Sequence, residues 1–201
     1  MTKFRLAIIA AAFLALIGLA GLNLYLGAQR AGPVVSTVTD PSQLPGGPFT
    51  LTDQNGRTVT EDVLKGKWTA VFFGYTYCPD YCPLSLQALA RVQKELGDKG
   101  RDFQIVFISV DPERDTQENL KAYLENGGMP QGAVGLTGSQ AQIDAVAKGY
   151  RTLVKKEPDG VFQHSTMIYL MDPQGRFNSV YAYDLPTGTM TGLIRDAMAG
   201  K

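Results

Sequence analysis

The chain has 201 residues, a length that accommodates one domain with attached segments more readily than two domains. Its 19 basic and 19 acidic side chains cancel, which disfavours a nucleic-acid-binding protein because no net field attracts a phosphate backbone. Two cysteines are too few for a disulfide-rich scaffold or a four-thiolate zinc site, but they can form one functional pair.

The first segment with a clear character is an uncharged apolar stretch, Leu6–Ala28. A helix of this length is about 35 Å long and exceeds a bilayer core of about 30 Å. Lys3 and Arg5 precede the stretch, so we expect residues 1–30 to be a single-pass anchor with a cytoplasmic N-terminus. A cleaved signal peptide is the alternative, although its apolar region is typically only about 7–15 residues long.

In both cases the remainder of the chain is exported, where disulfides are allowed. The apolar stretch begins so close to Met1 that no Arg-rich organelle presequence fits before it. We therefore expect a bacterial inner membrane, with the C-terminal part facing the periplasm. Residues 31–48 contain four prolines and no periodic apolar pattern, which predicts a tether that spans roughly 3 Å per residue. One folded domain, residues 49–201, follows it.

The domain opens with a predicted β-hairpin over residues 49–60, in which Asn55-Gly56 separates two alternating segments. Trp68–Phe73 and Phe103–Val110 are nearly continuous apolar runs, typical of strands buried on both faces of a sheet. Apolar residues at helical spacing follow Pro83 between these runs. A strand, a helix and a strand in this order predict a right-handed parallel crossover.

The last part of the chain has a different pattern. Helices are expected after Asp115-Thr116, around Ile143–Tyr150 and, to close the chain, around Met190–Met198. Thr166–Met171 and Phe177–Tyr183 predict two strands joined by a turn. A parallel half followed by an antiparallel hairpin and a closing helix outlines an α/β, thioredoxin-like fold, here with an added N-terminal β-hairpin.

The sharpest local feature is the cysteine pair, Cys78 and Cys82, which directly follows the Trp68–Phe73 strand. Pro83 suits the first turn of a helix, so both cysteines are expected in the strand-to-helix loop, where the helix dipole lowers thiol pKa values. A structural disulfide is the alternative. It is disfavoured because closing a loop of about five residues contributes only roughly 2 kcal/mol.

His164 is the only histidine of the chain and immediately precedes the Thr166–Met171 strand. In a thioredoxin-like arrangement, the loop that enters this strand lies against the cysteine loop. Two thiolates and one imidazole then converge, a donor set that suits copper as Cu(I) or Cu(II). A structural zinc site would require a fourth protein ligand. We therefore expect Cys78, Cys82 and His164 to bind one copper ion.

Three separated motifs resemble those of the Sco/SenC family: Gly74–Pro83, Ser109–Thr116, and His164-Ser165 leading into Tyr169–Gly175. The resemblance covers most of residues 49–201 and includes the N-terminal anchor. It implies a membrane-anchored, thioredoxin-like copper protein that helps to assemble the dinuclear copper centre in subunit II of cytochrome c oxidase. The matching positions imply three copper ligands, namely Cys78, Cys82 and His164.

One departure from the family pattern is Gln163, where an acidic residue often precedes the histidine. We expect it to affect the tuning of the site more than ligation. Asp111 is interpreted as a turn residue before the next helix, and Asp80 as a hydrogen-bonding loop residue. The tyrosines near the cysteines are expected to pack or to line a partner surface, and the C-terminal methionines to lie in the core.

Other functions remain open from the residues alone. The redox-active pair Cys78 and Cys82 is compatible with a thiol–disulfide oxidoreductase that acts on the cysteines of a copper-receiving partner. The C-x-x-x-C spacing and the absence of a proline near His164 disfavour a general oxidoreductase. A peroxidase of the peroxiredoxin or glutathione-peroxidase type is less favoured, because the second cysteine is so near. Other periplasmic copper chaperones or thiol reductants are further expected partners.

Overall fold

The computed structural model describes residues 18, 44–158, 160 and 162–201. The predicted anchor, apart from Gly18, and most of the predicted tether lie outside the described residues. Within the part of the chain that is described, no helix combines the length and the apolar character needed to cross a bilayer. The folded unit treated below belongs to Ser42–Lys201, which is compact by itself.

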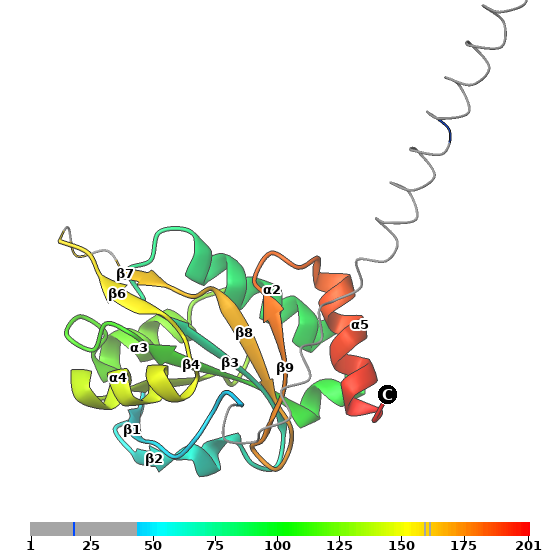
Figure 1. Cartoon of the computed structure of the whole chain (residues 1–201), viewed down its shortest axis with the longest axis horizontal. Coiled ribbons are helices and arrows are strands. Elements are labelled where there is room, and N and C mark those ends of the chain that lie inside the picture. The colour runs from blue at the N-terminus through cyan, green and yellow to red at the C-terminus, as the bar shows by residue number, and fades with distance from the viewer. Residues whose placement is uncertain (1–17, 19–43, 159, 161) are drawn as a thin grey trace, which may run out of the picture. The chain divides into compact units, whose positions relative to one another are not determined.

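A seven-stranded mixed sheet forms the centre of this unit, in the order β2-β1-β5-β4-β3-β8-β9, and a separate two-stranded sheet pairs β6 with β7 (Figure 1). The strands are β1 (Thr50–Asp53), β2 (Thr58–Thr60), β3 (Trp68–Gly74), β4 (Phe103–Ser109), β5 (Val134–Thr137), β6 (Val154–Lys156), β7 (Phe162–His164), β8 (Met167–Met171) and β9 (Phe177–Ala182). The α-helices are α2 (Tyr81–Glu95), α3 (Gln117–Leu124), α4 (Gln140–Gly149) and α5 (Thr187–Met198). Short 3₁₀ segments cover Glu61–Leu64 and Gly97–Asp102.

The two most apolar strands, β3 and β4, lie next to each other near the middle of the sheet. They pair in parallel from Trp68 opposite Phe103 to Gly74 opposite Ser109, which confirms the predicted crossover through α2. Almost all of their side chains are buried, because helices cover both faces of the sheet. The C-terminal ends of both strands therefore open at one edge, where ligands of α/β sheets commonly bind.

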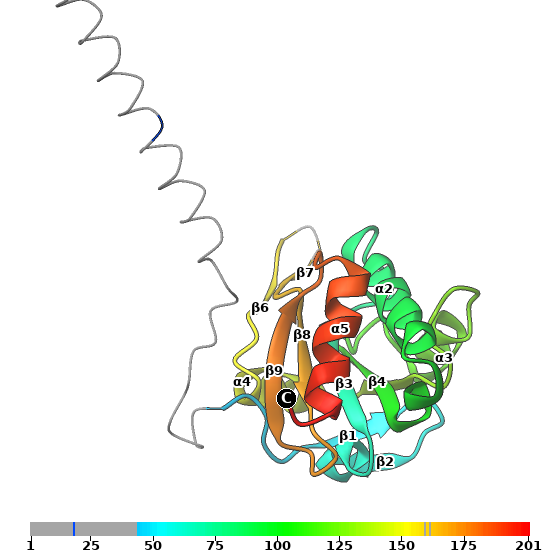
Figure 2. The ribbon, with the colours of Figure 1, turned by 90° about the vertical axis from the view of Figure 1, so that its right-hand side faces the viewer.

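Two successive residues of β3 show which helix covers which face of the sheet. Gly74 faces Cys82 of α2, whereas the ring of Phe73 contacts Tyr150 at the end of α4, with centroids 5.2 Å apart. Because successive side chains of a strand point to opposite faces, α2 and α4 cover opposite faces. Helix α5 packs against α2, and Figure 2 shows the two helices side by side.

The C-terminal part confirms the predicted antiparallel hairpin and closing helix. Strand β8 pairs with β3 and with β9, antiparallel in both cases, and α5 follows. Met190 is fully buried and Met198 packs against the core, as expected for a core-facing methionine row. The N-terminal hairpin is confirmed as well, since Thr50–Thr52 pair with Thr58–Thr60 across the Asn55-Gly56 turn.

Three short strands were not predicted. Strand β5 joins the main sheet between β1 and β4, and β6 and β7 form the small separate hairpin that ends at His164. Strands of three or four residues carry little apolar periodicity, whereas the equally short β1 and β2 were revealed by the alternation on either side of Asn55-Gly56. The consequence for the site is direct, because His164 lies at the end of a hairpin strand and not simply in a loop before β8.

Candidate metal centre

The cysteine segment begins where β3 ends. Cys78 lies in a turn closed by a hydrogen bond from its own N–H to the carbonyl of Tyr75, 3.2 Å. Helix α2 begins at Tyr81, so Cys82 lies in the first helical turn and not in the preceding loop. The expectation that both cysteines lie in the loop was therefore wrong for Cys82. The helix can begin at Tyr81, two residues before Pro83, because the N–H groups of the first turn have no partner within the helix. A proline, which has no N–H, is therefore tolerated in this turn.

The two cysteines are free thiols with different accessibility. Cys82 is fully buried, whereas Cys78 keeps 8% of its surface exposed. The backbone N–H of Cys82 donates to Cys78 Sγ over 3.5 Å. The donor lies in the first turn of α2, where unpaired N–H groups and the helix dipole favour a negative charge. The arrangement therefore favours a thiolate at Cys78.

The pKa values of the pair diverge for this reason. A hydrogen bond from the Cys82 thiol, helped by bonds from the N–H groups of Cys82 and Asp80, lowers the pKa of Cys78 to about 3, although burial opposes this shift. The hydrogen bond that Cys82 donates to Cys78, together with burial and the neighbouring charge, raises the pKa of Cys82. In the reduced protein, one thiolate and one buried thiol therefore lie side by side at neutral pH.

His164 approaches the pair from the hairpin strand β7. Its Nε2 lies 3.5 Å from Cys82 Sγ, and its Nδ1 lies 3.1 Å from the carbonyl oxygen of Ser165. Because a carbonyl can only accept, the ring hydrogen belongs on Nδ1, which leaves the lone pair of Nε2 directed at the sulfur. The rings of Phe72 and Tyr75 lie edge-on to the imidazole, with centroids 6.3 and 5.9 Å away.

The fold thus brings together three side chains that are far apart in sequence. One ligand atom from each of Cys78, Cys82 and His164 lies within 4.8 Å of the others. Metal–sulfur and metal–nitrogen bonds of about 2.0–2.3 Å let one ion join atoms up to about 4.6 Å apart, so a small movement of the ligands is enough for one ion to reach all three atoms. Two sulfurs and an imidazole nitrogen are soft to borderline donors, so the residues fit copper.

Gly74 is a site residue that the sequence marked only as the first position of the Gly74–Pro83 motif. A Cβ atom at this position would lie 2.7 Å from Cys82 Sγ and 2.7 Å from Cε2 of Phe107. The missing side chain therefore lets the first turn of α2 approach the end of β3. The signal in the sequence was a glycine at the end of an otherwise bulky strand, which often marks a close backbone approach.

Asp111 behaves as the turn residue that was predicted, because its carbonyl accepts from the N–H groups of Arg114 and Asp115. Thr116 caps α3 by accepting from the N–H of Asn119, which was also expected. Among the described residues, neither the Asp111 nor the Asp115 carboxylate belongs to the ligand group. Asp111 and Asp115 are both fully buried, which the sequence did not predict.

Asp115 ties the cysteine loop to the end of β4. Its carboxylate accepts from the N–H and the hydroxyl of Thr76, at 3.0 and 2.6 Å, and from the hydroxyl of Ser109, at 2.6 Å. Burial raises the pKa of this carboxyl in spite of these bonds. The network therefore fixes Thr76, two residues before Cys78, to the end of β4.

The tyrosines near the cysteines divide into two groups. Tyr75 is buried and packs against the ring of Phe162, with centroids 5.5 Å apart. Tyr77 and Tyr81, at 58% and 51% exposure, leave their rings open to solvent beside the ligand group. Packing is thereby confirmed for Tyr75, and a partner surface at Tyr77 and Tyr81 stays a prediction.

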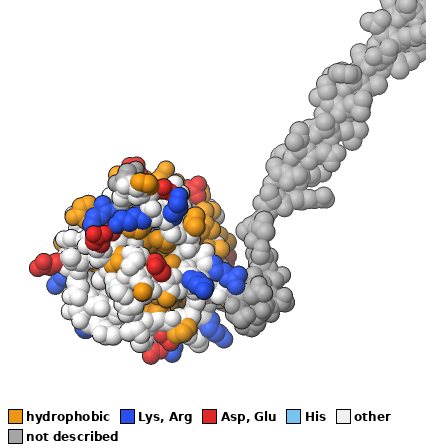
Figure 3. Space-filling model, turned by 60° about the vertical axis from the view of Figure 1, so that its left-hand side comes forward, with side chains coloured by type: hydrophobic (Ala, Val, Ile, Leu, Met, Phe, Trp, Pro, Cys, Tyr) orange, Lys and Arg blue, Asp and Glu red, His pale blue; other side chains and the backbone are white. Residues whose placement is uncertain are grey.

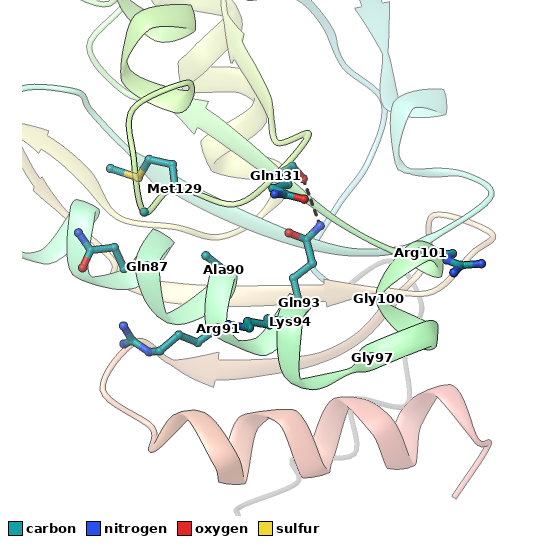
Figure 4. Close-up of a pocket in the computed structure, with 11 residues that line it drawn as sticks. Gln87, Ala90, Arg91, Gln93, Lys94, Gly97, Gly100, Arg101, Met129 and Gln131 are labelled. Carbon is teal, nitrogen blue, oxygen red and sulfur yellow. Dashed lines mark hydrogen bonds between the residues drawn. The ribbon is translucent and has the colours of Figure 1, made fainter.

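A pocket of about 750 Å³ lies apart from this group, between α2 and the loop that contains Met129 and Gln131. In Figure 4, Arg91 and Arg101 extend toward opposite ends of the pocket and do not converge on a common point. None of the three sulfur and imidazole ligands lines it. The candidate centre is therefore a compact coordination group and not a cavity.

Comparison with known proteins decides the family. The family model described as SCO1/SenC matches residues 37–199. The chain belongs to the SCO1/SenC family. Its sequence is 42% identical to Protein SenC of Rhodobacter capsulatus over 69% of this chain and 64% of that protein. It is 43% identical to the mitochondrial protein SCO2 of Saccharomyces cerevisiae, over 66% of this chain and 46% of that protein.

Solved Sco structures share the fold. The crystal structure of Arabidopsis thaliana ScoI with copper bound matches with a TM-score of 0.73 and 38% identity, covering 78% of this chain and 99% of that one. BsSco, described as a member of the Sco family of cytochrome c oxidase assembly proteins and as having a disulfide switch, matches with a TM-score of 0.65 and 30% identity, over 79% and 95%. The thioredoxin-like fold of the Sco family is thereby confirmed. The chain spans about half the length of the mitochondrial relatives it matches.

Proposed function

We propose that this chain binds one copper ion through Cys78, Cys82 and His164 and hands it on during the assembly of cytochrome c oxidase. The observation that carries the proposal is the triangle of two sulfurs and one imidazole nitrogen, all within 4.8 Å. Copper-bound structures of family members support it.

The chemistry of the donors suits a metal that is held and then released. Thiolates favour Cu(I), and imidazole accepts either oxidation state. Three protein ligands leave one side of the ion open to a ligand from a partner. Cys82 is fully buried, whereas Cys78 is 8% exposed and His164 is half-buried, so the partner would approach from their side. The exposed rings of Tyr77 and Tyr81 frame that approach.

The proposal extends to the setting of the protein. Residues 1–30 would anchor it in a bacterial inner membrane, residues 31–48 would act as a tether, and residues 49–201 would work as the copper-binding domain in the periplasm. The uncharged stretch Leu6–Ala28 supports the anchor. The receiving protein would be subunit II of cytochrome c oxidase, at its dinuclear copper centre, with periplasmic copper chaperones or thiol reductants as further partners.

Copper titration of the full chain tests the site. The reduced protein, in detergent and without a polyhistidine tag, is titrated against a chromogenic Cu(I) chelator and examined by X-ray absorption. We expect one copper ion with two sulfur ligands and one nitrogen ligand. Cys78→Ala, Cys82→Ala and His164→Ala should each weaken binding, whereas Gln163→Ala, next to His164 and exposed, should retain it. Unchanged affinity in His164→Ala would contradict the proposed site.

Copper transfer tests the role in assembly. The loaded protein is mixed with the reduced, metal-free copper domain of oxidase subunit II, and the copper content of each protein is measured after separation. We expect copper to move to the acceptor domain. Retention of copper by this chain with an acceptor that binds free copper would contradict delivery.

A second candidate function is reduction of a disulfide in the copper-receiving partner, favoured by the low pKa of Cys78 next to a second thiol. The Cys78 thiolate would attack a partner sulfur and form a mixed disulfide, releasing one partner thiolate. Cys82 would then attack Cys78, releasing the second partner thiolate and leaving this chain oxidised. Cys82→Ser should trap the mixed disulfide, visible by mass spectrometry, and Cys78→Ser should not. Failure of the reduced wild type to reduce an oxidised peptide from the partner would exclude this role.

A further inference from the structure

Arg114, which lies in the turn between β4 and α3, contacts three separate parts of the fold at once. Its Nε donates to Oδ2 of Asp111, and its Nη2 donates to the carbonyl oxygen of Gly160 over 2.8 Å. The guanidinium carbon also lies 5.1 Å from the ring centroid of Tyr77 and 5.8 Å from that of Tyr75. The end of β4, the cysteine segment and the β6–β7 hairpin therefore meet at one side chain.

The hairpin depends on such contacts for its position. Strands β6 and β7 pair only with each other among the described residues, so no ladder of backbone hydrogen bonds joins them to the seven-stranded sheet. The ion pair between Lys156 and Glu113 also reaches across to the hairpin, but both side chains are largely exposed, and such pairs contribute little. Apart from the short chain segment that leads from His164 into β8, side-chain contacts therefore set the position of the hairpin.

Arg114 is the strongest polar contact of the hairpin for a physical reason. The Asp111 carboxylate is 1% exposed and the Arg114 side chain 38% exposed, so water screens this ion pair less than it screens a pair with both partners at the surface. Its planar fork has a second direction left for the Gly160 carbonyl, and its flat face lies over the tyrosine rings. A lysine would keep the charge but lose this combination.

Gly160 is placed to receive this bond. Its φ is +82°, a left-handed conformation that favours glycine, and its N–H donates to the carbonyl of Glu157 over 2.9 Å. The turn thereby presents the Gly160 carbonyl to Arg114 four residues before His164. On the other side of the hairpin, Val154 pairs with His164, so a shift of the turn moves the imidazole.

We propose that Arg114 is a positioning residue that holds His164 against the cysteine pair through the Gly160 carbonyl and the Tyr75 and Tyr77 rings. Arg114 does not touch the copper cargo. It orders the hairpin before copper arrives, so that the third ligand need not be immobilised on binding. This role rests on the proposed copper site, and it also predicts a property of the metal-free protein.

The first test uses the metal-free, reduced full chain, in which the single histidine makes the ring signals unambiguous. We expect the ¹⁵N signals of the His164 imidazole in Arg114→Lys to broaden or to move toward those of a free imidazole. Arg57→Lys is the matched control, because Arg57 likewise pairs with a buried aspartate, Asp53, but in the β1–β2 hairpin. Ring signals that are unchanged in Arg114→Lys, or changed equally in Arg57→Lys, would overturn the proposal.

The second test measures Cu(I) affinity in a double-mutant cycle. We expect Arg114→Lys to weaken binding about 10–100-fold, the usual range for residues that orient a ligand. Combined with His164→Ala, Arg114→Lys should cause no further loss, because the ligand it positions is gone. A full additional loss in the double variant would overturn the proposal.

The two tests also distinguish an error in the proposed copper site from an error in the proposed role of Arg114. If His164→Ala binds copper as tightly as the wild type, the proposed copper site is wrong, and the ring signals of the metal-free protein still decide the role of Arg114. If His164→Ala weakens binding and the Arg114→Lys ring signals do not change, the site stands and Arg114 has no positioning role. Gly160→Ala provides a second variant that keeps Arg114, and it should change the ring signals in the same direction.

Discussion

Gly74 is the residue at which β3 and the first turn of α2 come closest. A methyl group here would meet Cys82 Sγ and the Phe107 ring, each at 2.7 Å. Both neighbours are fully buried, so they can move only by disturbing the core. We expect Gly74→Ala to lower the free energy of unfolding by about 1–3 kcal/mol, as overpacking typically does, and to weaken copper binding by displacing Cys82. Urea unfolding and chelator competition measure the two effects.

Gly192 provides the matched control for that substitution. It lies within α5, and a Cβ atom there would have nothing within 4 Å. Gly192→Ala should therefore leave copper binding unchanged and stabilise the protein by up to about 1 kcal/mol through helix propensity. Equal behaviour of the two variants would show that the close approach at Gly74 has no effect.

The two thiols should differ in how their reactivity depends on pH. The pKa of Cys78 is lowered to about 3, so its reactive thiolate should persist as the pH falls from 8 to 5, and it is lost only as the pH approaches 3. Cys82 has a raised pKa and is buried, so it should stay unmodified over the same range. Iodoacetamide labelling of the reduced, metal-free protein, followed by peptide mass spectrometry, identifies the modified cysteine at each pH.

An ordinary thiol has a pKa of about 8.5 and loses reactivity tenfold for each pH unit below it. A decline of that kind at Cys78 would contradict the assigned hydrogen bonds. Labelling in 6 M urea serves as the control, because both cysteines should then follow the ordinary profile.

At the scale of elements, two turns use the same construction. In the β1–β2 hairpin, Asp53 accepts from the N–H groups of Asn55 and Arg57 and from the guanidinium of Arg57. In the β8–β9 hairpin, Asp172 accepts in the same way from Gln174 and Arg176. Each carboxylate replaces the backbone acceptors that a tight turn lacks.

Asp53 is the more buried of the two and should contribute stability that depends on pH. Burial alone would raise its pKa, but the bonds from Arg57 and Asn55 outweigh burial and hold the pKa below its ordinary value. Its contribution is therefore complete above an ordinary carboxyl pKa of about 4 and is lost as the pH falls through the lower, folded-state value. We expect Asp53→Asn to destabilise the protein by about 1–3 kcal/mol at pH 7 and by less at pH 3, measured by urea unfolding.

Asp62 is the comparison for that measurement. It pairs with Lys65 at the surface, where both side chains are more than half exposed. Asp62→Asn should leave the free energy of unfolding nearly unchanged at either pH. A loss for Asp53→Asn that is the same at pH 7 and pH 3 would contradict the stated linkage.

At the scale of the whole molecule, the site joins parts of unequal stability. β3 supplies the support for the cysteines and lies inside the seven-stranded sheet, whereas β7 supplies His164 and belongs to a two-stranded hairpin. Isolated hairpins of this size are marginal, so β6 and β7 should open more often than β3 and β4. Copper would link the two parts.

Amide hydrogen exchange measures this difference. In the metal-free protein we expect the amides of β6 and β7 to exchange before those of β3, β4 and β8. Copper should slow exchange in the hairpin of the wild type but not of His164→Ala, because only the wild type has the ligand that ties β7 to the cysteines. Uniform exchange across all of these strands, or equal protection in His164→Ala, would contradict the prediction.

The face of the domain that Figure 3 shows carries no large patch of one charge sign. Figure 3 shows basic and acidic side chains interspersed over one face, with hydrophobic side chains between them. The mixture agrees with the balanced composition of 19 basic and 19 acidic residues. Recognition of a partner would therefore depend more on local contacts, such as the exposed rings of Tyr77 and Tyr81, than on long-range steering.

Patterns that are local in the chain predicted the main elements well. The apolar runs that became β3 and β4, the helix spacing in α2 and α5, and the Asn55-Gly56 turn were all recognised. Burial on both faces, helical spacing and turn geometry each leave a signature within a few neighbouring residues. Strands β5, β6 and β7 were missed, because three or four residues leave little periodicity, whereas the Asn55-Gly56 turn marked the equally short β1 and β2.

The sequence by itself determined the chemistry that is available: two thiols four positions apart after a buried strand, and a single imidazole far downstream. Only the tertiary structure decided how these groups meet. It brings their ligand atoms within 4.8 Å, gives Cys78 and Cys82 opposite pKa shifts, and joins the histidine hairpin to the rest through Arg114. The physical reason is that distance, burial and hydrogen-bond direction depend on contacts between segments, and residue types and spacing do not specify these contacts.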